Sequence, residues 1–287
     1  MVEIQTEEIK KYIQEFMKPI IVIPIYSERL TSDEKASLRQ CLSILGKYDV
    51  AFLTYSGLDT SVYEQQVSSF KSVNVRYEYF DKKNFDGIDG YNRFCLSSEL
   101  YERFVGYDYM LIYQLDAWVF ADRLIEWCEK GYDYIGPPFF DDWSSDTPHI
   151  IGVGNGGLSL RRIQFFRDLL KLGQRMYSTR QLFRQCSCCA DYLRLIPKAI
   201  FGFRNTTSDF IQKKYKQGFN EDIIISVFLK DSLCVPNIPS PKVAMNFAME
   251  RFPSKLYQAN GNQLPFGCHA FRKYEFNSFW YQFINLN

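Results

Sequence analysis

One carboxylate of this sequence stands where an unpaired charge would be costly. Asp116 follows the apolar run YMLIYQL, residues 109–115, and Val119 and Phe120 resume the apolar pattern just beyond it. A buried aspartate without a partner costs several kcal/mol or takes up a proton. We therefore expect Asp116 to face a metal ion, another cation or a set of N–H donors.

A second acidic pair, Glu221 and Asp222, stands ahead of the apolar residues 223–229. A carboxylate at a helix start stays ionised near neutral pH, as a general base requires. An ordinary helix start has the same composition, with Asn220 as the cap and acids in the first turn. The pair is therefore either a candidate base or simply the beginning of a helix.

Two further segments could approach a ligand. Residues 152–162, GVGNGGLSLRR, contain four glycines, which allow close approach of a ligand; a tight bend between elements is the alternative explanation. His269 is one of only two histidines and lies between a Pro-Phe-Gly bend and Ala270. A lone histidine in an apolar setting is more often a hydrogen-bonded core residue than a ligand.

The elements that must position these residues alternate between strand and helix. Apolar or alternating runs predict strands at residues 20–26, 50–55, 75–80 and 109–115. Helical spacing predicts helices at residues 31–46, 62–70, 91–105 and 121–131. Strands joined by helices predict an α/β protein with a parallel sheet and right-handed crossovers.

In such sheets, ligands bind at the carboxyl ends of the strands. Tyr26 and Ser27 follow the first strand, Ser56 follows the second and Asp116 follows the fourth, so we expect all of them to line one crevice. The turn after the first strand, IPIYSERL, contains no glycine, which disfavours a dinucleotide fold with its GxGxxG turn. The sequence also contains no GxxxxGK[ST] segment, which excludes a P-loop.

Residues 177–219 carry clustered Arg, Lys, Phe and Cys without clear strand signals. We predict a helical insertion in the second half of the chain. Its basic side could rest peripherally on the inner face of a membrane or on an anionic acceptor, and a solvated helical face is the alternative.

The composition narrows the class of protein. The 287 residues are 46% hydrophobic and carry a net charge of +1, which gives no reason to expect a nucleic acid as partner. No apolar run approaches the roughly 20 residues that span a bilayer. The N-terminal residues, MVEIQTEEIKKYIQEF, are charged and amphipathic rather than a signal peptide, so we predict a cytoplasmic protein.

Five segments together resemble a bacterial and fungal family known mainly as a domain of unknown function and assigned to the GT-A nucleotide-sugar glycosyltransferases. They read YNRFCLSSELYERFVGYDYMLIYQLDAWVF, WCEKGYDYIGPPF, VGNGGLSLRR, NEDIIIS and PFGCHAF. The resemblance spans residues 20–272. It implies one GT-A-like domain over residues 1–287, with a Rossmann-like, mixed or parallel central sheet flanked by helices. Residues 19–135 would bind the nucleotide sugar, and residues 136–287 would face the acceptor.

The resemblance also implies an activity and roles for residues. The enzyme would move a sugar from a UDP- or GDP-sugar to a glycan or lipid-linked hydroxyl acceptor, with inversion, in surface polysaccharide synthesis. Asp222 resembles the catalytic acid of the family's ED motif, with Glu221 as the other candidate base. The implied donor-binding residues are Tyr26, Ser27, Ser56, Arg93, Gln114 and Asp116. The implied acceptor-binding residues are Trp118, Asn155, Gly156 and Gly157.

A divalent cation, Mn²⁺ or Mg²⁺, is implied as well. The DxD metal motif of GT-A enzymes is here Gln114-Leu115-Asp116, with a single carboxylate, and His269 resembles the late histidine that completes many of these metal sites. Two alternatives remain: a sugar nucleotidyltransferase, which usually carries a Gly-rich basic loop after the first strand, and a non-catalytic sugar-binding protein on the same fold.

Overall fold

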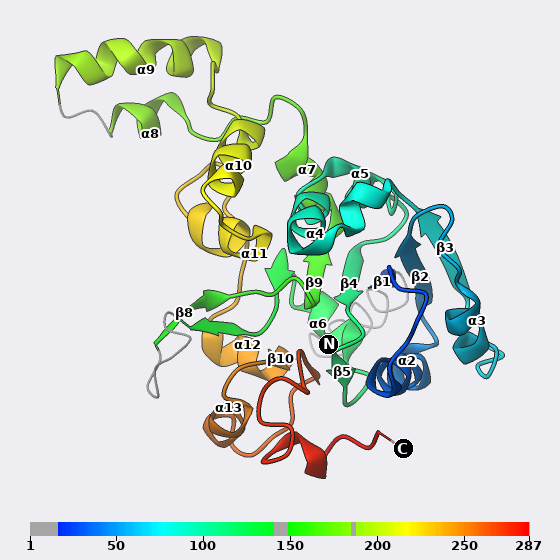
Figure 1. Cartoon of the computed structure of the whole chain (residues 1–287). Coiled ribbons are helices and arrows are strands. Elements are labelled where there is room, and N and C mark those ends of the chain that lie inside the picture. The colour runs from blue at the N-terminus through cyan, green and yellow to red at the C-terminus, as the bar shows by residue number, and fades with distance from the viewer. Residues whose placement is uncertain (1–16, 141–148, 185–187, 287) are drawn as a thin grey trace, which may run out of the picture.

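A six-stranded sheet forms the centre of the protein (Figure 1). The structure is a computed structural model, and it describes residues 17–140, 149–184 and 188–286. Within them the strands run in the order β3 (Val75–Tyr79), β2 (Asp49–Thr54), β1 (Pro19–Pro24), β4 (Tyr109–Tyr113), β9 (Leu158–Arg162) and β6 (Tyr134–Ile135). β3, β2, β1 and β4 are parallel, whereas β9 is antiparallel to both of its neighbours. The predicted mostly parallel sheet is confirmed.

The central strand β1 is buried along its whole length. Ile20 and Val22 pack into the apolar cluster on one face of the sheet, and Ile21 and Ile23 pack into the cluster on the other face. A strand covered on both faces needs a continuous apolar run, which is what the sequence PIIVIP supplies.

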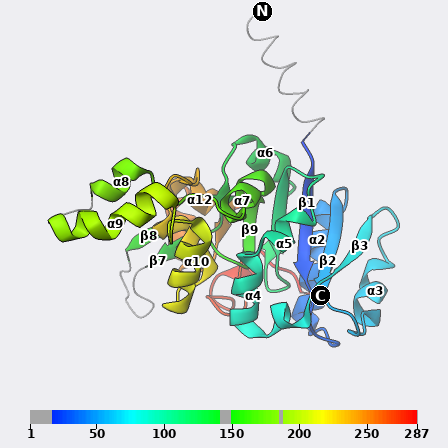
Figure 2. The ribbon, with the colours of Figure 1, turned by 90° about the horizontal axis from the view of Figure 1, so that it is seen from above.

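Helices cover both faces (Figure 2), which confirms the α/β class. One face packs against α2 (Ser32–Leu45), α3 (Ser61–Val67), α6 (Leu124–Glu129) and α12 (Pro241–Phe247). The other packs against α4 (Gly87–Cys95), α5 (Ser98–Glu102), α7 (Ile163–Leu170) and α10 (Thr207–Lys216). α2 begins with the capping box expected from Thr31 and Glu34.

The single helix expected at residues 91–105 is wrong in its extent. The segment forms α4 and α5, with a break at Leu96 and Ser97. Ser97 is extended, and its hydroxyl donates to the Phe94 carbonyl at 2.8 Å. A serine that satisfies a backbone carbonyl in this way competes with helix continuation.

Short strands beside the main sheet bring distant segments together. β5 (Trp118–Val119) pairs with β11 (Gly267–Cys268), which pairs in turn with β10 (Ala248–Met249). β7 (Pro138–Phe140) pairs with β8 (Ile150–Val153) and leads into β9. The other short elements are α13 (Pro253–Ala259) and the 3₁₀ turns Lys82–Phe85 and Trp280–Gln282. Through β5 and β11, the segment after β4 meets the C-terminal part of the chain.

The segment expected to be a helical insertion contains α8 (Thr179–Phe183), α9 (Cys189–Phe201) and α10. In Figures 1 and 2, α8 and α9 project away from the central sheet. None of the helices in the described residues has both the length and the apolar character needed to cross a bilayer.

Candidate active site

A cleft of about 180 Å³ opens at the carboxyl ends of β1 and β4. Its walls are formed by Pro24, Tyr26, Ser27, Glu34, Tyr63, Gln114, Leu115 and Asp116. Because β1 and β4 are adjacent and parallel, the residues that follow them meet at one edge of the sheet. Four of the predicted donor-binding residues are therefore brought together: Tyr26, Ser27, Gln114 and Asp116.

Asp116 faces His269. Cys268 pairs with Trp118 in the β5–β11 ladder, so the next residue, His269, lies beside the turn that carries Asp116. His269 Nε2 is 3.1 Å from Asp116 Oδ1, and His269 Nδ1 is 3.2 Å from Glu250 Oε1. Within the described part of the chain, the buried Nε2 makes no hydrogen bond of good geometry. His269 is therefore the partner of Asp116. Its Nε2 points at the carboxylate but is left without a well-formed hydrogen bond.

The two carboxylates set the charge of this histidine. Burial alone would lower the pKa of His269, but the adjacent carboxylates of Asp116 and Glu250 raise it to about 10. Burial alone would raise the pKa of Asp116, but His269 outweighs it and the pKa of Asp116 is lowered. At neutral pH the ligand-free site therefore holds an imidazolium between two carboxylates.

Glu250 is a site residue that sequence reasoning missed. Its Oε1 contacts His269, and its Oε2 accepts a hydrogen bond of 3.0 Å from Asn155 Nδ2. Asn155 Oδ1 in turn accepts from the Gly157 N–H at 2.6 Å. Glu250 thus connects the histidine to residues 154–157 between β8 and β9, which we call the glycine loop. The signal that identified Asp116, an acid directly after an apolar run, is also present here, because Glu250 follows Phe247-Ala-Met.

The glycine loop between β8 and β9 lies directly against the histidine. The Gly157 carbonyl accepts a hydrogen bond from the Gln114 N–H at 2.8 Å. A Cβ on Gly157 would lie 2.0 Å from His269 Nε2 and 2.7 Å from Gln114 Oε1. No larger residue fits there without moving those side chains, so the glycine serves close packing as well as the bend. Gln114 Oε1 and His269 Nε2 therefore border the same small space.

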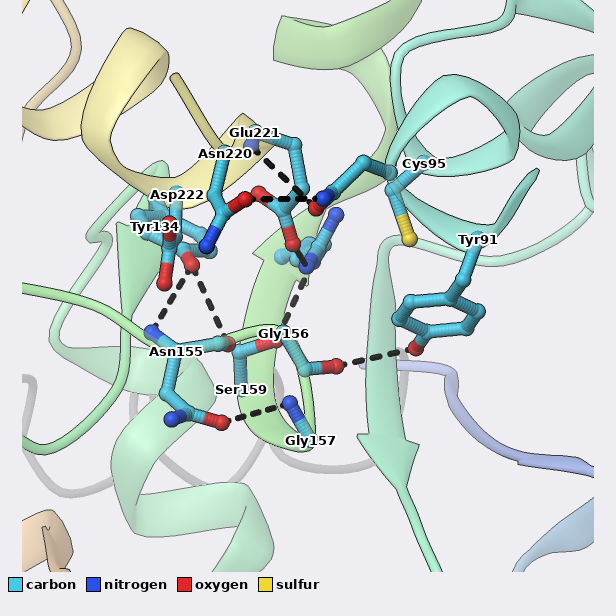
Figure 3. Close-up of polar contacts among 12 residues, drawn as sticks. Tyr91, Cys95, Tyr134, Asn155, Gly156, Gly157, Ser159, Asn220, Glu221 and Asp222 are labelled. Atoms are coloured by element: carbon cyan, nitrogen blue, oxygen red, sulfur yellow. Dashed lines mark hydrogen bonds and ion pairs between the residues drawn. The ribbon is translucent and has the colours of Figure 1, made fainter. Parts of the chain in front are cut away.

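The two adjacent acids at the start of α11 (Glu221–Ile223) have different environments (Figure 3). Glu221 is 1% exposed, and its Oε1 accepts from Arg161 Nη2 at 2.7 Å, with Arg161 fully buried. Asp222 lacks such a bond and accepts only from the adjacent Ile223 N–H at 2.8 Å, among the hydrogen bonds of the described residues. Burial, and next to it the charge of Glu221, raise the pKa of Asp222 to about 7.

The glycine loop also touches the elements around these acids. The Tyr91 hydroxyl donates to the Gly156 carbonyl at 2.9 Å, and the Asn155 N–H donates to the Tyr134 hydroxyl at 3.0 Å. Figure 3 shows Tyr134 beside Asp222, with Asn155 below them. The loop therefore connects the surroundings of His269, at Gly157, with those of Asp222, at Tyr134.

Asn220 does not cap the helix as expected. It occupies the position before α11, but its Oδ1 accepts from Asn92 Nδ2 at 3.0 Å and makes no capping bond. The Glu221 N–H is satisfied instead by Asn92 Oδ1 at 3.3 Å. A π-helical turn, Ile224–Phe228, follows directly. Such turns frequently occur at functional sites.

Arg161 was not singled out from the sequence, although it is the penultimate residue of β9, LSLRR. Besides Glu221, its guanidinium donates to Tyr101 Oη at 2.9 Å and to Ser159 Oγ at 3.1 Å. Arg161→Met leaves Glu221 as a buried unpaired charge. We expect a loss of about 3–5 kcal/mol in the free energy of unfolding, measured by urea denaturation.

The double variant Arg161→Met, Glu221→Leu is the matched control for this prediction. It removes both charges of the ion pair, so it should recover most of the lost stability. If Arg161→Met alone unfolds at the wild-type urea concentration, the ion pair contributes nothing to folding.

Three predicted residues lie away from the cleft. Ser56 is exposed in the turn after β2. Arg93 donates to the Lys83 carbonyl at 3.1 Å and lines a separate hollow beside α10. Trp118 is 4% exposed and packs edge-on against Phe271 in the C-terminal core. The proposed site therefore does not include these three residues.

The side chains around His269 could hold a divalent cation. Among the described residues no cluster of three or more His, Cys, Asp or Glu side chains forms a ready-made metal site. However, the orphaned His269 Nε2 lies 3.1 Å from Asp116 Oδ1, and Gly157 packs against both Nε2 and Gln114 Oε1. Glu250 holds the other imidazole nitrogen, as outer-shell carboxylates do for metal-bound histidines. With phosphate oxygens and water completing the coordination, this set suits Mn²⁺ or Mg²⁺.

A sequence comparison assigns the chain to a family. Residues 74–269 match the family described as "Protein of unknown function (DUF5672)". The chain belongs to this family. The matched range includes β4, the glycine loop, Asp222 and His269, whereas the β1 side of the cleft, with Tyr26 and Ser27, precedes it. No curated protein matches the chain.

Solved structures show distant likenesses. Core-mannan synthase A from Aspergillus fumigatus, in a Mn/GDP form, is 12% identical over 54% of this chain, with a TM-score of 0.40. The chain spans 62% of that protein's length. The apo-form glycosyltransferase GlyE from Streptococcus pneumoniae TIGR4 is 11% identical, with 88% of this chain and 54% of that chain covered and a TM-score of 0.40.

A third likeness belongs to a different class of enzyme. 4-diphosphocytidyl-2C-methyl-D-erythritolsynthase from Anaerococcus prevotii DSM 20548 is 7% identical, with 64% of this chain and 83% of that chain covered and a TM-score of 0.37. Likenesses this distant carry no argument about activity, so the function is argued below from the site.

Proposed function

We propose that the protein is a GT-A-type glycosyltransferase that moves a sugar from a nucleotide-sugar donor to a hydroxyl acceptor. The observation that carries the proposal is a pair of acidic groups in different environments, with the glycine loop in contact with the surroundings of both. At one end Asp116 lines the cleft beside β1 and β4, and the orphaned His269 Nε2 lies 3.1 Å from its carboxylate. At the other end Asp222 has a pKa of about 7.

The cleft is the proposed donor site. Tyr26 and Ser27 on the β1 side would contact a UDP or GDP moiety, and Gln114, Asp116 and His269 would hold a divalent cation at its diphosphate. When bound, the cation offsets the negative charge that develops on the leaving diphosphate. His269 must give up its proton to ligate, and Glu250 keeps the ring oriented through Nδ1.

Asp222 is the proposed general base. Its carboxylate would accept the acceptor hydroxyl proton as the hydroxyl attacks the anomeric carbon, and direct attack of this kind inverts the configuration. A base functions best with a pKa near the working pH, which the pKa of about 7 provides. Glu221 is less suited to the role, because it is held by Arg161 and is 1% exposed.

The acceptor would lie along the glycine loop. Backbone groups of Asn155, Gly156 and Gly157 form hydrogen bonds with Tyr134, Tyr91 and Gln114, and these bonds would hold the loop in place as a wall of the acceptor site. A glycan or lipid-linked hydroxyl resting there would have its reacting oxygen directed at Asp222. A role in surface polysaccharide synthesis is consistent with such an acceptor.

Ligand binding tests the donor half of the proposal. We expect UDP or GDP to raise the melting temperature in the presence of Mn²⁺ by mass action. Asp116→Asn and His269→Ala should each weaken this Mn²⁺-dependent binding by about 10–100-fold, measured by calorimetry.

Ser56→Ala is the matched control, because Ser56 follows β2 at the same edge of the sheet but lies outside the cleft. It should bind like the wild type. Nucleotide binding that is equal with and without Mn²⁺ in the wild type would remove the cation from the proposal. No shift with any nucleotide at millimolar concentration would remove the donor site as well.

A further inference from the structure

The hairpin formed by α8 and α9 carries an apolar surface that the rest of the described chain leaves uncovered. Five side chains of α9 and the turn after it make this surface, with exposed fractions of 72% for Leu193, 37% for Ile196, 63% for Ile200, 80% for Phe201 and 59% for Phe203. We call these five residues the α9 face. Burying even part of it would be favourable, since each large apolar side chain gains free energy on leaving water.

Three of these residues form one continuous stripe. Leu193, Ile196 and Ile200 are separated by three and four positions, so they share a side of the helix. Ala199 is 5% exposed, and the Thr179 hydroxyl of α8 donates to its carbonyl at 3.4 Å. α8 therefore covers the opposite side of α9 and supports the stripe from behind. Figures 1 and 2 show the hairpin projecting from the body, where a flat surface can reach it.

Positive charge surrounds the stripe. The segment 171–204 contains one acidic residue, Asp191, and seven basic residues: Lys171, Arg175, Arg180, Arg184, Arg194, Lys198 and Arg204. The whole chain has a net charge of only +1, so the remainder of the chain is net negative. Within α9, Arg194 and Lys198 lie one turn apart beside Phe201, on the side of the helix away from Ile196 and Ile200.

The apolar side chains and the positive charge together favour one binding partner of the α9 face over another. A second copy of the chain would bring two strongly basic hairpins against each other, and like charges disfavour that contact. A helix with an apolar face of Leu, Ile and Phe and basic residues on its other side matches the interface of an anionic bilayer. We propose that the α9 face docks on an anionic lipid surface, with its apolar side chains at the acyl boundary and Arg194 and Lys198 at the lipid headgroups.

Vesicle co-sedimentation of the full chain tests this proposal. We expect binding to vesicles of phosphatidylcholine with phosphatidylserine, weak binding to phosphatidylcholine alone, and loss of binding in high salt. Leu193→Ser with Ile200→Ser should lower the partition coefficient about tenfold or more. Arg194→Glu with Lys198→Glu should lower it by a similar factor on the anionic vesicles only.

Matched controls use exposed apolar residues and exposed lysines outside the hairpin. Val105 and Tyr79 are each 50% exposed, so Val105→Ser with Tyr79→Ser should leave vesicle binding unchanged. The charge control is Lys71→Glu with Lys130→Glu, since both lysines are exposed. Far-ultraviolet circular dichroism establishes that each variant remains folded.

Three results would overturn the proposal. The first is a wild type that binds neither kind of vesicle. The second is equal binding to both kinds, unchanged by the Arg194 and Lys198 substitutions. The third is a wild-type dimer in sedimentation velocity that becomes a monomer in the Leu193, Ile200 variant, because the face would then be an interface between copies.

Discussion

Asp222→Asn should reduce sugar transfer by about 10²–10⁴-fold while donor binding stays near the wild-type value. The substitution keeps the shape of the side chain and removes its ability to accept a proton. Asp222 makes no ion pair and does not line the donor cleft, within the described residues, so the donor site should be undisturbed. Initial rates at saturating donor, with donor affinity from calorimetry, separate the two effects.

Glu221→Gln is the control for this assignment. It weakens the ion pair with Arg161 and should therefore lower stability, but at a temperature where the variant is folded it should retain most of the transfer activity. The opposite pattern, an active Asp222→Asn and a folded but inactive Glu221→Gln, would assign the base to Glu221.

The pKa of Asp222 adds a pH signature to the same variant. The charged groups around it are Glu221 beside it, Arg161 of β9 and Glu250 after β10, and burial with the charge of Glu221 raises its pKa to about 7. The wild-type rate should therefore rise with pH up to about pH 7 and then level off. A residual rate of Asp222→Asn that shows the same rise would contradict the assignment.

As the pH rises, the stability of the wild type should fall while its activity rises. A carboxyl whose pKa is raised from 3.8 in the unfolded chain to about 7 in the folded protein lowers stability as the pH rises between these values. The cost is fully present above about pH 7, where it is at most about 4 kcal/mol. Asp222→Asn removes it, so the variant should unfold at a higher urea concentration than the wild type at about pH 8.

Gly157→Ala should strongly weaken cation-dependent donor binding. The new methyl group would lie 2.0 Å from His269 Nε2 and 2.7 Å from Gln114 Oε1, in the space that these two atoms border. The side chains must move apart to admit it. Since both are proposed ligands, we expect affinity for Mn²⁺ with nucleoside diphosphate to fall about 100-fold or more, by calorimetry.

Gly106→Ala is the matched control, because a Cβ there meets no atom within 4 Å. It should bind like the wild type. Normal Mn²⁺-dependent binding by Gly157→Ala would place the cation elsewhere and would leave the packing of His269 as the reason for the glycine.

Local patterns predicted most of the first half of the fold. The apolar runs of β1 and β4 and the Thr31 capping box depend on neighbouring residues, so they could be recognised from the sequence. The break at Ser97 was missed, because the hydroxyl bond to Phe94 competes with a helix pattern that otherwise continues. The position of Asn220 before α11 was correct, but its capping role was not, because Asn92 on another helix bonds its side chain.

The site was less predictable, because its contacts join distant segments. Asp116 stood out as a charge after a strand, and its position at the strand end explains the cleft. Its 3.1 Å contact with His269 depends on the two-residue strands β5 and β11, which have no recognisable periodicity of their own. The same holds for Arg161, whose partner Glu221 lies 60 residues away. Nothing local shows that one acid of the Glu221-Asp222 pair is neutralised by an arginine while the other is not.

The most direct test of the proposed activity is donor turnover by the wild type and Asp222→Asn. A panel of UDP- and GDP-sugars with Mn²⁺ and a mixture of glycan and lipid-linked acceptors is assayed for release of nucleoside diphosphate. The proposal predicts release from at least one donor by the wild type. With Asp222→Asn the rate should be lower by a factor of about 100 or more. No release from any donor, or release of pyrophosphate from a nucleoside triphosphate and a sugar phosphate instead, would contradict it.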